Sequence, residues 1–131
     1  MNKIILVSGA VFGVLSIVLG AFGAHALKAL VGVEALQTFE VGVRYQMYHA
    51  LLLLFVGNTD FIREKTKKVI FYLVVIGVFF FSFSIYGLAT NVLTSFNFKI
   101  IGFVTPIGGL LLIAAWVFMI VNFLKIPSEK H

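Results

Sequence analysis

Long apolar stretches separated by short polar segments dominate this sequence. Residues 4–27 contain no Asp, Glu, Lys or Arg, and the same holds for residues 69–90 and 100–124. A helix that crosses the ~30 Å hydrocarbon layer of a membrane needs ~20 largely apolar residues. The pattern therefore predicts three membrane-spanning helices. The first apolar run is too long for a secretory signal core of ~7–15 residues, so we expect it to be a retained span.

A fourth span is predicted over residues 38–57, on a weaker pattern. Its apolar part, residues 41–56, would be only ~24 Å long at ~1.5 Å per residue, and it includes Arg44 and His49. Residues 35–40 would extend it, either as the same helix or as a short interfacial one. The fold expected from the whole pattern is an all-α, four-transmembrane-helix bundle, with residues 1–131 forming a single domain. A three-span arrangement is the alternative.

The composition agrees with a membrane protein and excludes a soluble enzyme. Apolar residues make up 61% of the chain and charged residues 11%, whereas soluble domains have roughly 45–50% and 25%. Mean hydropathy is +1.11. Because the chain contains no cysteine, disulfides, thiolate metal sites, cysteine nucleophiles and a lipidated cysteine are all excluded.

The distribution of basic residues predicts the orientation. With four spans, the two termini and the middle loop share one side, which carries Lys3, Arg63, Lys65, Lys67, Lys68, Lys125 and Lys130. The other side carries Lys28, Arg44 and Lys99. Short cytoplasmic loops retain Lys and Arg, so both termini should be cytoplasmic in a bacterial plasma or inner membrane. The basic cluster is more consistent with contact to the lipid bilayer than with nucleic acid, because no base-stacking aromatics accompany it.

Small residues form a stripe along the first predicted span. Gly9, Gly13, Ser16, Gly20 and Gly23 recur at alternating spacings of four and three. Small side chains on one helical face allow a second helix backbone to approach closely. The stripe therefore predicts helix packing, against a helix of the same chain or of a second copy.

Polar side chains from all four predicted spans gather at one depth, towards the outside. This outer polar layer comprises His25, Glu40, Arg44, Tyr45, Gln46, Tyr48, His49, Ser82, Ser84, Tyr86 and Thr105. Glu40 and Arg44 have the spacing and order of a helical ion pair, and His25 and His49 are expected to meet. Ionisable groups inside a membrane often mark ligand or ion sites, but the same groups could simply hydrogen-bond one another and fix the helix register. We favour the second interpretation.

Neither metal binding nor catalysis is predicted. His25, His49 and Glu40 have suitable ligand chemistry, but they lack a local metal-binding spacing. No motif of a hydrolase or a phosphate-binding loop is present, so we expect no cofactor and no enzymatic activity. Trp116, in the middle of the last span, is interpreted as a packing residue.

Pro106 leaves the start of the last span open. A helix that begins near Lys99 would be kinked at Pro106, because the Gly102 carbonyl would lose its partner. A helix that begins at Pro106 would hold the proline comfortably in its first turn. Residues 97–105 would then be interfacial.

Four motifs resemble a known family. They are GAFGAHAL at 20–27, YQMYHAL at 45–51, FSFSIY at 81–86 and TPIGG at 105–109. Together they are similar to the YgdD/YwdK-like family of small membrane proteins, whose animal relatives are called transmembrane protein 256. The resemblance covers nearly the whole chain. It implies four transmembrane helices in the plasma membrane and no established activity.

Two functional hypotheses follow. The first is a non-enzymatic small membrane protein that acts by helix packing with itself, as a homo-oligomer, or with another membrane component. The second is a small-ligand or ion binder, or a transporter, that uses the outer polar layer.

Overall fold

The structure is a computed structural model that describes residues 1–93 and 102–127, and the all-α prediction is confirmed for these residues. The helices are α1 (Asn2–Ala24), α2 (Val33–Asn58), α3 (Glu64–Val78), α4 (Ser84–Ala89) and α5 (Val104–Leu124). A π-helical segment, η2 (Phe79–Phe83), joins α3 to α4. Short 3₁₀ turns follow α1 and α4, at η1 (Leu27–Ala29) and η3 (Asn91–Leu93).

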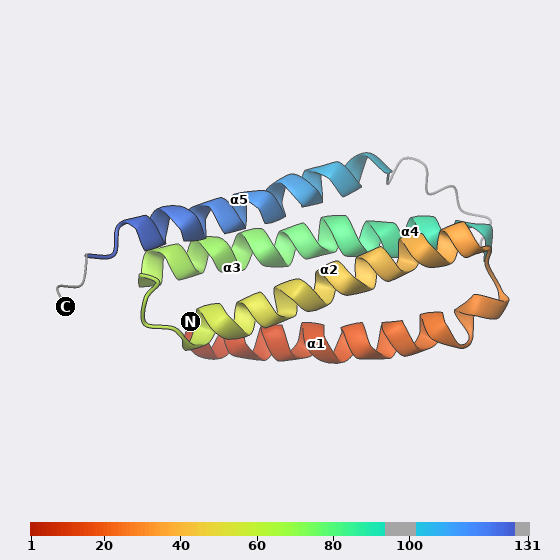
Figure 1. Ribbon diagram of the computed structural model, residues 1–131, viewed down its shortest axis with the longest axis horizontal. Helices are drawn as coiled ribbons and strands as arrows, with labels where there is room; N and C mark the ends of the chain where they lie inside the picture. Colours follow the sequence, from red (N-terminus) through yellow and green to blue (C-terminus); the bar gives the residue numbers. More distant parts are fainter. Residues whose placement is uncertain (94–101, 128–131) are drawn as a thin grey trace.

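The long helices form two antiparallel pairs that lie side by side (Figure 1). One pair is α1 with α2. The other is α5 with the continuous rod of α3, η2 and α4. Met1, residues 59–63 and Leu124 lie at the same end of the molecule, here called the basic end because it also holds Arg63 and Lys125. The chain therefore runs along the long axis four times.

Helix boundaries differ from the expected spans mainly at their ends. The first helix ends at Ala24, and residues 35–40 continue α2 as the same helix. The rod of α3, η2 and α4 begins at Glu64, earlier than the predicted span over residues 69–90. Helix α5 begins at Val104, so Pro106 lies in its first turn, where a backbone N–H would have no helical partner anyway. Residues 94–101, which include the predicted start of the last span, lie outside the described residues.

Three helical stretches of the described chain are long and apolar enough to cross a membrane. They are Asn2–Ala29, Glu64–Ala89 and Val104–Leu124. Helix α2 has the length, with 26 residues, but its polar side chains lower its hydropathy. This lower hydropathy agrees with the weaker apolar pattern of the second predicted span.

The core lies where α2 packs between α1 and the rod. Its larger cluster includes Ile5, Leu53, Val56, Ile70 and Val74, all fully buried. Glycines set the closest approaches between helices. A Cβ at Gly9 would lie 2.9 Å from the Ala50 carbonyl oxygen, and one at Gly108 would lie 2.4 Å from the Phe81 amide nitrogen. Backbones can meet this closely only where the side chain is absent.

Candidate functional site

The structure divides the predicted outer polar layer into a buried and an exposed group. Gln46, His49, Ser82 and Ser84 are buried, while Tyr86 and Thr105 are half-buried. The exposed members are His25, Glu40, Arg44, Tyr45 and Tyr48. The layer is therefore not a single site, and the two groups have different surroundings.

A chain of hydrogen bonds through Gln46 connects three helices. The Tyr86 hydroxyl on α4 donates to Gln46 Oε1 over 2.6 Å, and Gln46 Nε2 donates to the Phe12 carbonyl of α1 over 2.9 Å. Gln46 is 0% exposed. A buried amide without partners would cost ~1–3 kcal/mol, so these two bonds make its position acceptable and fix the register of α2.

Two serines satisfy carbonyl groups around the π-helical segment. Ser82 Oγ donates to the Gly42 carbonyl of α2 over 2.8 Å. Ser84 Oγ lies 2.9 Å from the Phe81 carbonyl oxygen and 2.6 Å from Thr105 Oγ1 on α5. Gly42 faces the Tyr86 ring so closely that a Cβ there would lie 2.7 Å from it. These contacts join α2 and α5 to the rod at and beside its π-helical segment, η2.

Both ring nitrogens of His49 are occupied. Nδ1 lies 2.7 Å from the Tyr45 carbonyl oxygen, and Trp116 Nε1 lies 3.1 Å from Nε2. A carbonyl oxygen only accepts, so Nδ1 carries the proton; the indole N–H only donates, so Nε2 is the acceptor. His49 in this arrangement has no nitrogen left for a metal or for taking a proton from a substrate.

Two specific expectations about this layer were wrong. Glu40 and Arg44 do not form an ion pair; the ion pair found in the described chain is Lys67 with Glu64, at 3.9 Å. His25 and His49 do not meet. The residue of α1 that lies beside this part of α2 is Gly13. A Cβ at Gly13 would lie 4.0 Å from Ala50, the residue after His49. His25 lies twelve residues further along the chain, ~18 Å at the helical rise.

The metal ligands considered from the sequence are also separated. Glu40 and His49 are nine residues apart on one helix, ~13.5 Å along its axis, so they cannot share an ion with His25. The described residues contain no group of three His, Asp or Glu that could hold a metal ion.

A groove lies on the side of the molecule between α2, η2 and α5. Its volume is about 300 Å³, and its lining includes Tyr45, His49, Phe81, Gly109, Leu112 and Trp116. Tyr45 is 40% exposed, and its hydroxyl has no hydrogen-bond partner among the described residues. This side groove is separate from a smaller pocket of about 200 Å³ nearer the outer end, whose lining includes Glu40 and Arg44.

The small-residue stripe of α1 faces α2 of the same chain. Cβ positions at Gly13, Gly20 and Gly23 lie 4.0, 3.5 and 3.1 Å from the nearest atoms of α2, and Ser16 is buried. The choice that the sequence left open, between a helix of the same chain and one of a second copy, is decided for the same chain.

The sequence interpretation missed several polar contacts. Trp116 is a hydrogen-bond donor as well as a packing residue, and the need of a lone indole N–H for a partner inside an apolar span could have signalled this. At the basic end, Lys67 Nζ donates to Asn2 Oδ1 over 3.1 Å, and Asn122 bonds to the connection before α3. Nothing in the local sequence distinguishes Lys67 from the exposed lysines beside it.

Comparisons with known proteins add the family. The profile of the family described as protein of unknown function (DUF423) matches residues 19–109. A UPF0382 membrane protein of Staphylococcus haemolyticus is 37% identical, over 94% of this chain and 97% of the relative. YwdK of Bacillus subtilis, a UPF0382 membrane protein, is 34% identical over 94% and 98%. YgdD of Escherichia coli, a UPF0382 inner membrane protein, is 30% identical over 98% and 95%.

No solved structure matches this chain. The relatives nevertheless cover almost the full length of both sequences, and they are named as membrane proteins. The predicted membrane localisation and the resemblance to the YgdD/YwdK-like proteins are therefore confirmed. The chain belongs to the DUF423 family, among the UPF0382 membrane proteins.

Proposed function

We propose that this protein is a non-enzymatic, four-span membrane protein that acts by packing against a second copy or another membrane component. The observation that carries the proposal is the closure of the polar layer. Gln46, His49, Ser82 and Tyr86 each form a hydrogen bond to another helix of the bundle, so these polar groups already have partners within the chain. Such a layer specifies a unique helix register, which a packing protein needs.

Helix α2 is the proposed fourth span. Its 26 residues extend ~39 Å, more than the ~30 Å of the hydrocarbon layer. Its central polar side chains, Gln46 and His49, have hydrogen-bond partners inside the bundle. Placing them in the membrane therefore leaves no polar group of theirs without a partner at these bonds. With four crossings, the excess of Lys and Arg at the basic end supports cytoplasmic termini.

The outer face of α1 is the proposed packing surface. Only 22% of the most apolar segment of this helix is buried within the chain, the lowest share among the three helical stretches that are apolar enough to cross a membrane. Since the small-residue stripe is already covered by α2, association has to use the opposite face. This face carries a shallow apolar depression lined by Val7, Ala10, Val11, Val14 and Leu15.

Cysteine chemistry tests this surface, because the natural chain has no cysteine. Ala10→Cys would place a single thiol on the exposed face, and Ser16→Cys would place one in the buried interface with α2. A thiol-attached photo-crosslinker at position 10 should capture a second copy or another membrane protein in native membranes. The Ser16→Cys control should capture neither. Lipid adducts alone at position 10 would contradict the proposal.

The second candidate function is binding of a small amphiphile in the side groove. The unpaired Tyr45 hydroxyl beside the groove favours a ligand with a hydrogen-bond acceptor. Trp116 is the only tryptophan and lines the groove, so its fluorescence reports occupancy. A long-chain brominated ketone should quench it more than a brominated alkane of equal length, and Tyr45→Phe should remove the difference. Equal quenching in the natural protein would exclude this candidate.

A further inference from the structure

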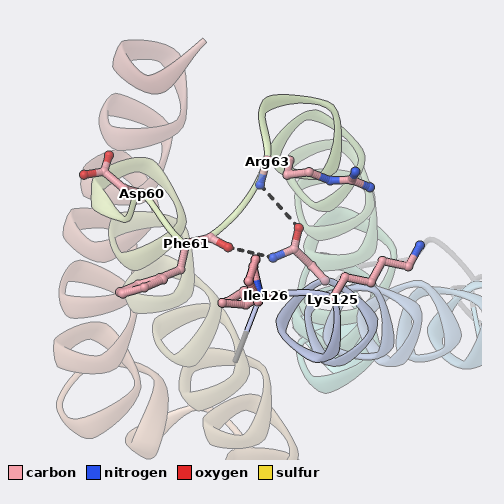
Figure 2. Close-up of a pocket in the computed structure, with 7 residues that line it drawn as sticks. Asp60, Phe61, Arg63, Lys125 and Ile126 are labelled. Carbon is pink, nitrogen blue, oxygen red and sulfur yellow. Dashed lines mark hydrogen bonds between the residues drawn. The ribbon is translucent and has the colours of Figure 1, made fainter. Parts of the chain in front are cut away.

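A second cavity lies at the basic end, where the connection between α2 and α3 meets the end of α5. Its volume is about 260 Å³. Figure 2 shows the side chains around it, including Asp60, Phe61, Arg63 and Lys125. The cavity is formed by residues that are distant in sequence, so its shape depends on how the two helix pairs are joined.

Asn122 holds the two walls of this cavity together. Its Nδ2 donates to the Phe61 carbonyl over 2.8 Å, and its Oδ1 accepts from the Arg63 amide over 3.3 Å (Figure 2). Asn122 is itself buried. The side chain therefore fixes the backbone of the connection on α5 and keeps Arg63 next to the cavity.

The cavity has two positive groups without a negative partner. Arg63 and Lys125 both line it, and within the described chain neither lies within ion-pair distance of a carboxylate. Asp60 also contributes to the lining, but Figure 2 shows its carboxylate on the opposite side of the view from the charged ends of Arg63 and Lys125. Two unpaired cations beside a fixed backbone are suited to a phosphate group.

Part of the cavity lining is apolar. It includes Phe61, which is 64% exposed, and Ile126 and Pro127, which follow α5. Exposed side chains of this kind belong in the acyl region of a membrane, while Arg63 and Lys125 belong at headgroup level. A ligand that fits both parts carries a phosphate and an attached hydrocarbon chain.

We propose that this cavity binds the phosphate of an anionic phospholipid, held by Arg63 and Lys125, with the acyl chains against Phe61 and Ile126. The site is distinct from the polar layer and from the outer face of α1, and it does not depend on the proposed function. Bound lipid would connect the start of α3 to the end of α5.

The experiment compares two double variants of the full chain that each lose two positive charges. Arg63→Gln with Lys125→Gln changes the cavity. Lys65→Gln with Lys68→Gln changes two exposed lysines of α3 outside it. Binding of phosphatidylglycerol and of phosphatidylcholine is measured by native mass spectrometry from detergent micelles, with circular dichroism to check folding.

The natural protein should retain phosphatidylglycerol over phosphatidylcholine. Each basic residue near an anionic surface contributes about fivefold to binding, so the cavity variant should lose roughly 25-fold and the control much less. Equal losses in both variants would overturn the proposal, because they would indicate general surface attraction. Inorganic phosphate should compete with the lipid only weakly. If phosphate bound as tightly as phosphatidylglycerol, the acyl contacts would be wrong and a free phosphate would be the ligand.

Discussion

Trp116 on α5 donates its indole N–H to Nε2 of His49 on α2, over 3.1 Å, and the two rings meet edge to face. Because Nδ1 of the same imidazole bonds to the Tyr45 carbonyl, the histidine is held from both sides. An ionisable residue inside an apolar helix usually suggests function. Here its two hydrogen bonds give it a structural role, which connects the two helix pairs.

The first prediction concerns this contact. Trp116→Phe keeps an aromatic ring but removes the N–H, so Nε2 of His49 loses its donor. We expect the free energy of unfolding to fall by about 1 kcal/mol. A double-mutant cycle with His49→Leu, measured by unfolding in mixed micelles with circular dichroism, should give a coupling energy of about 0.6 to 1.7 kcal/mol. Strictly additive effects would show that the bond does not form.

The second prediction concerns the chain through Gln46. Gln46→Leu would leave the Tyr86 hydroxyl without its acceptor, so it should destabilise the protein by about 1–3 kcal/mol. In a Tyr86→Phe background, no hydroxyl is left unpaired, and the added cost of Gln46→Leu should be smaller. The unfolding midpoints of the four proteins measure this difference. An unchanged cost in the Tyr86→Phe background would contradict the network.

The third prediction uses two adjacent glycines. A Cβ at Gly108 would lie 2.6 Å from the Phe80 carbonyl carbon, whereas one at Gly109 would have 3.7 Å to the nearest atom, on the Phe81 ring. Gly108→Ala should therefore push α5 away from η2 and cost about 1–3 kcal/mol. Gly109→Ala should be neutral or slightly stabilising, since alanine favours helix. Thermal unfolding in one detergent compares them, and equal midpoints would refute the close crossing.

The fourth prediction concerns the number of crossings. Lys28→Cys and Lys125→Cys place thiols on exposed residues at opposite ends of the bundle. In intact cells, a membrane-impermeant maleimide should label position 28 and leave position 125 unlabelled until the cells are opened. If both positions reacted from the outside, or neither did, the four-span topology with cytoplasmic termini would be wrong.

Much of the architecture was predictable because its causes are local. Uncharged apolar runs identify helices that can enter lipid, since each backbone N–H finds its partner within the same segment. The spacing of Gly9, Gly13, Ser16, Gly20 and Gly23 predicted a close helix contact, and only the identity of the partner was open. The motifs at 20–27 and 45–51 indicated the family, which the relatives then confirmed.

The predicted site was less reliable because the depth of a residue along the bundle does not determine which way its side chain points. His25 and His49 were assigned to one layer, yet His25 ends α1 in an exposed position and His49 lies buried against Trp116. Glu40 and Arg44 have the right spacing for an ion pair, but both are exposed and do not meet. A small change of angle or register between two helices changes which groups face each other.

The sequence by itself determined that this chain is a helical membrane protein with a strongly basic side, because hydropathy and charge act on each segment separately. Only the tertiary structure decided that Tyr86 donates to Gln46, that Trp116 donates to His49 and that Asn122 holds Phe61 and Arg63. These pairs are 40, 67, 61 and 59 residues apart. Their formation depends on how whole helices rotate and cross, and no local pattern encodes that.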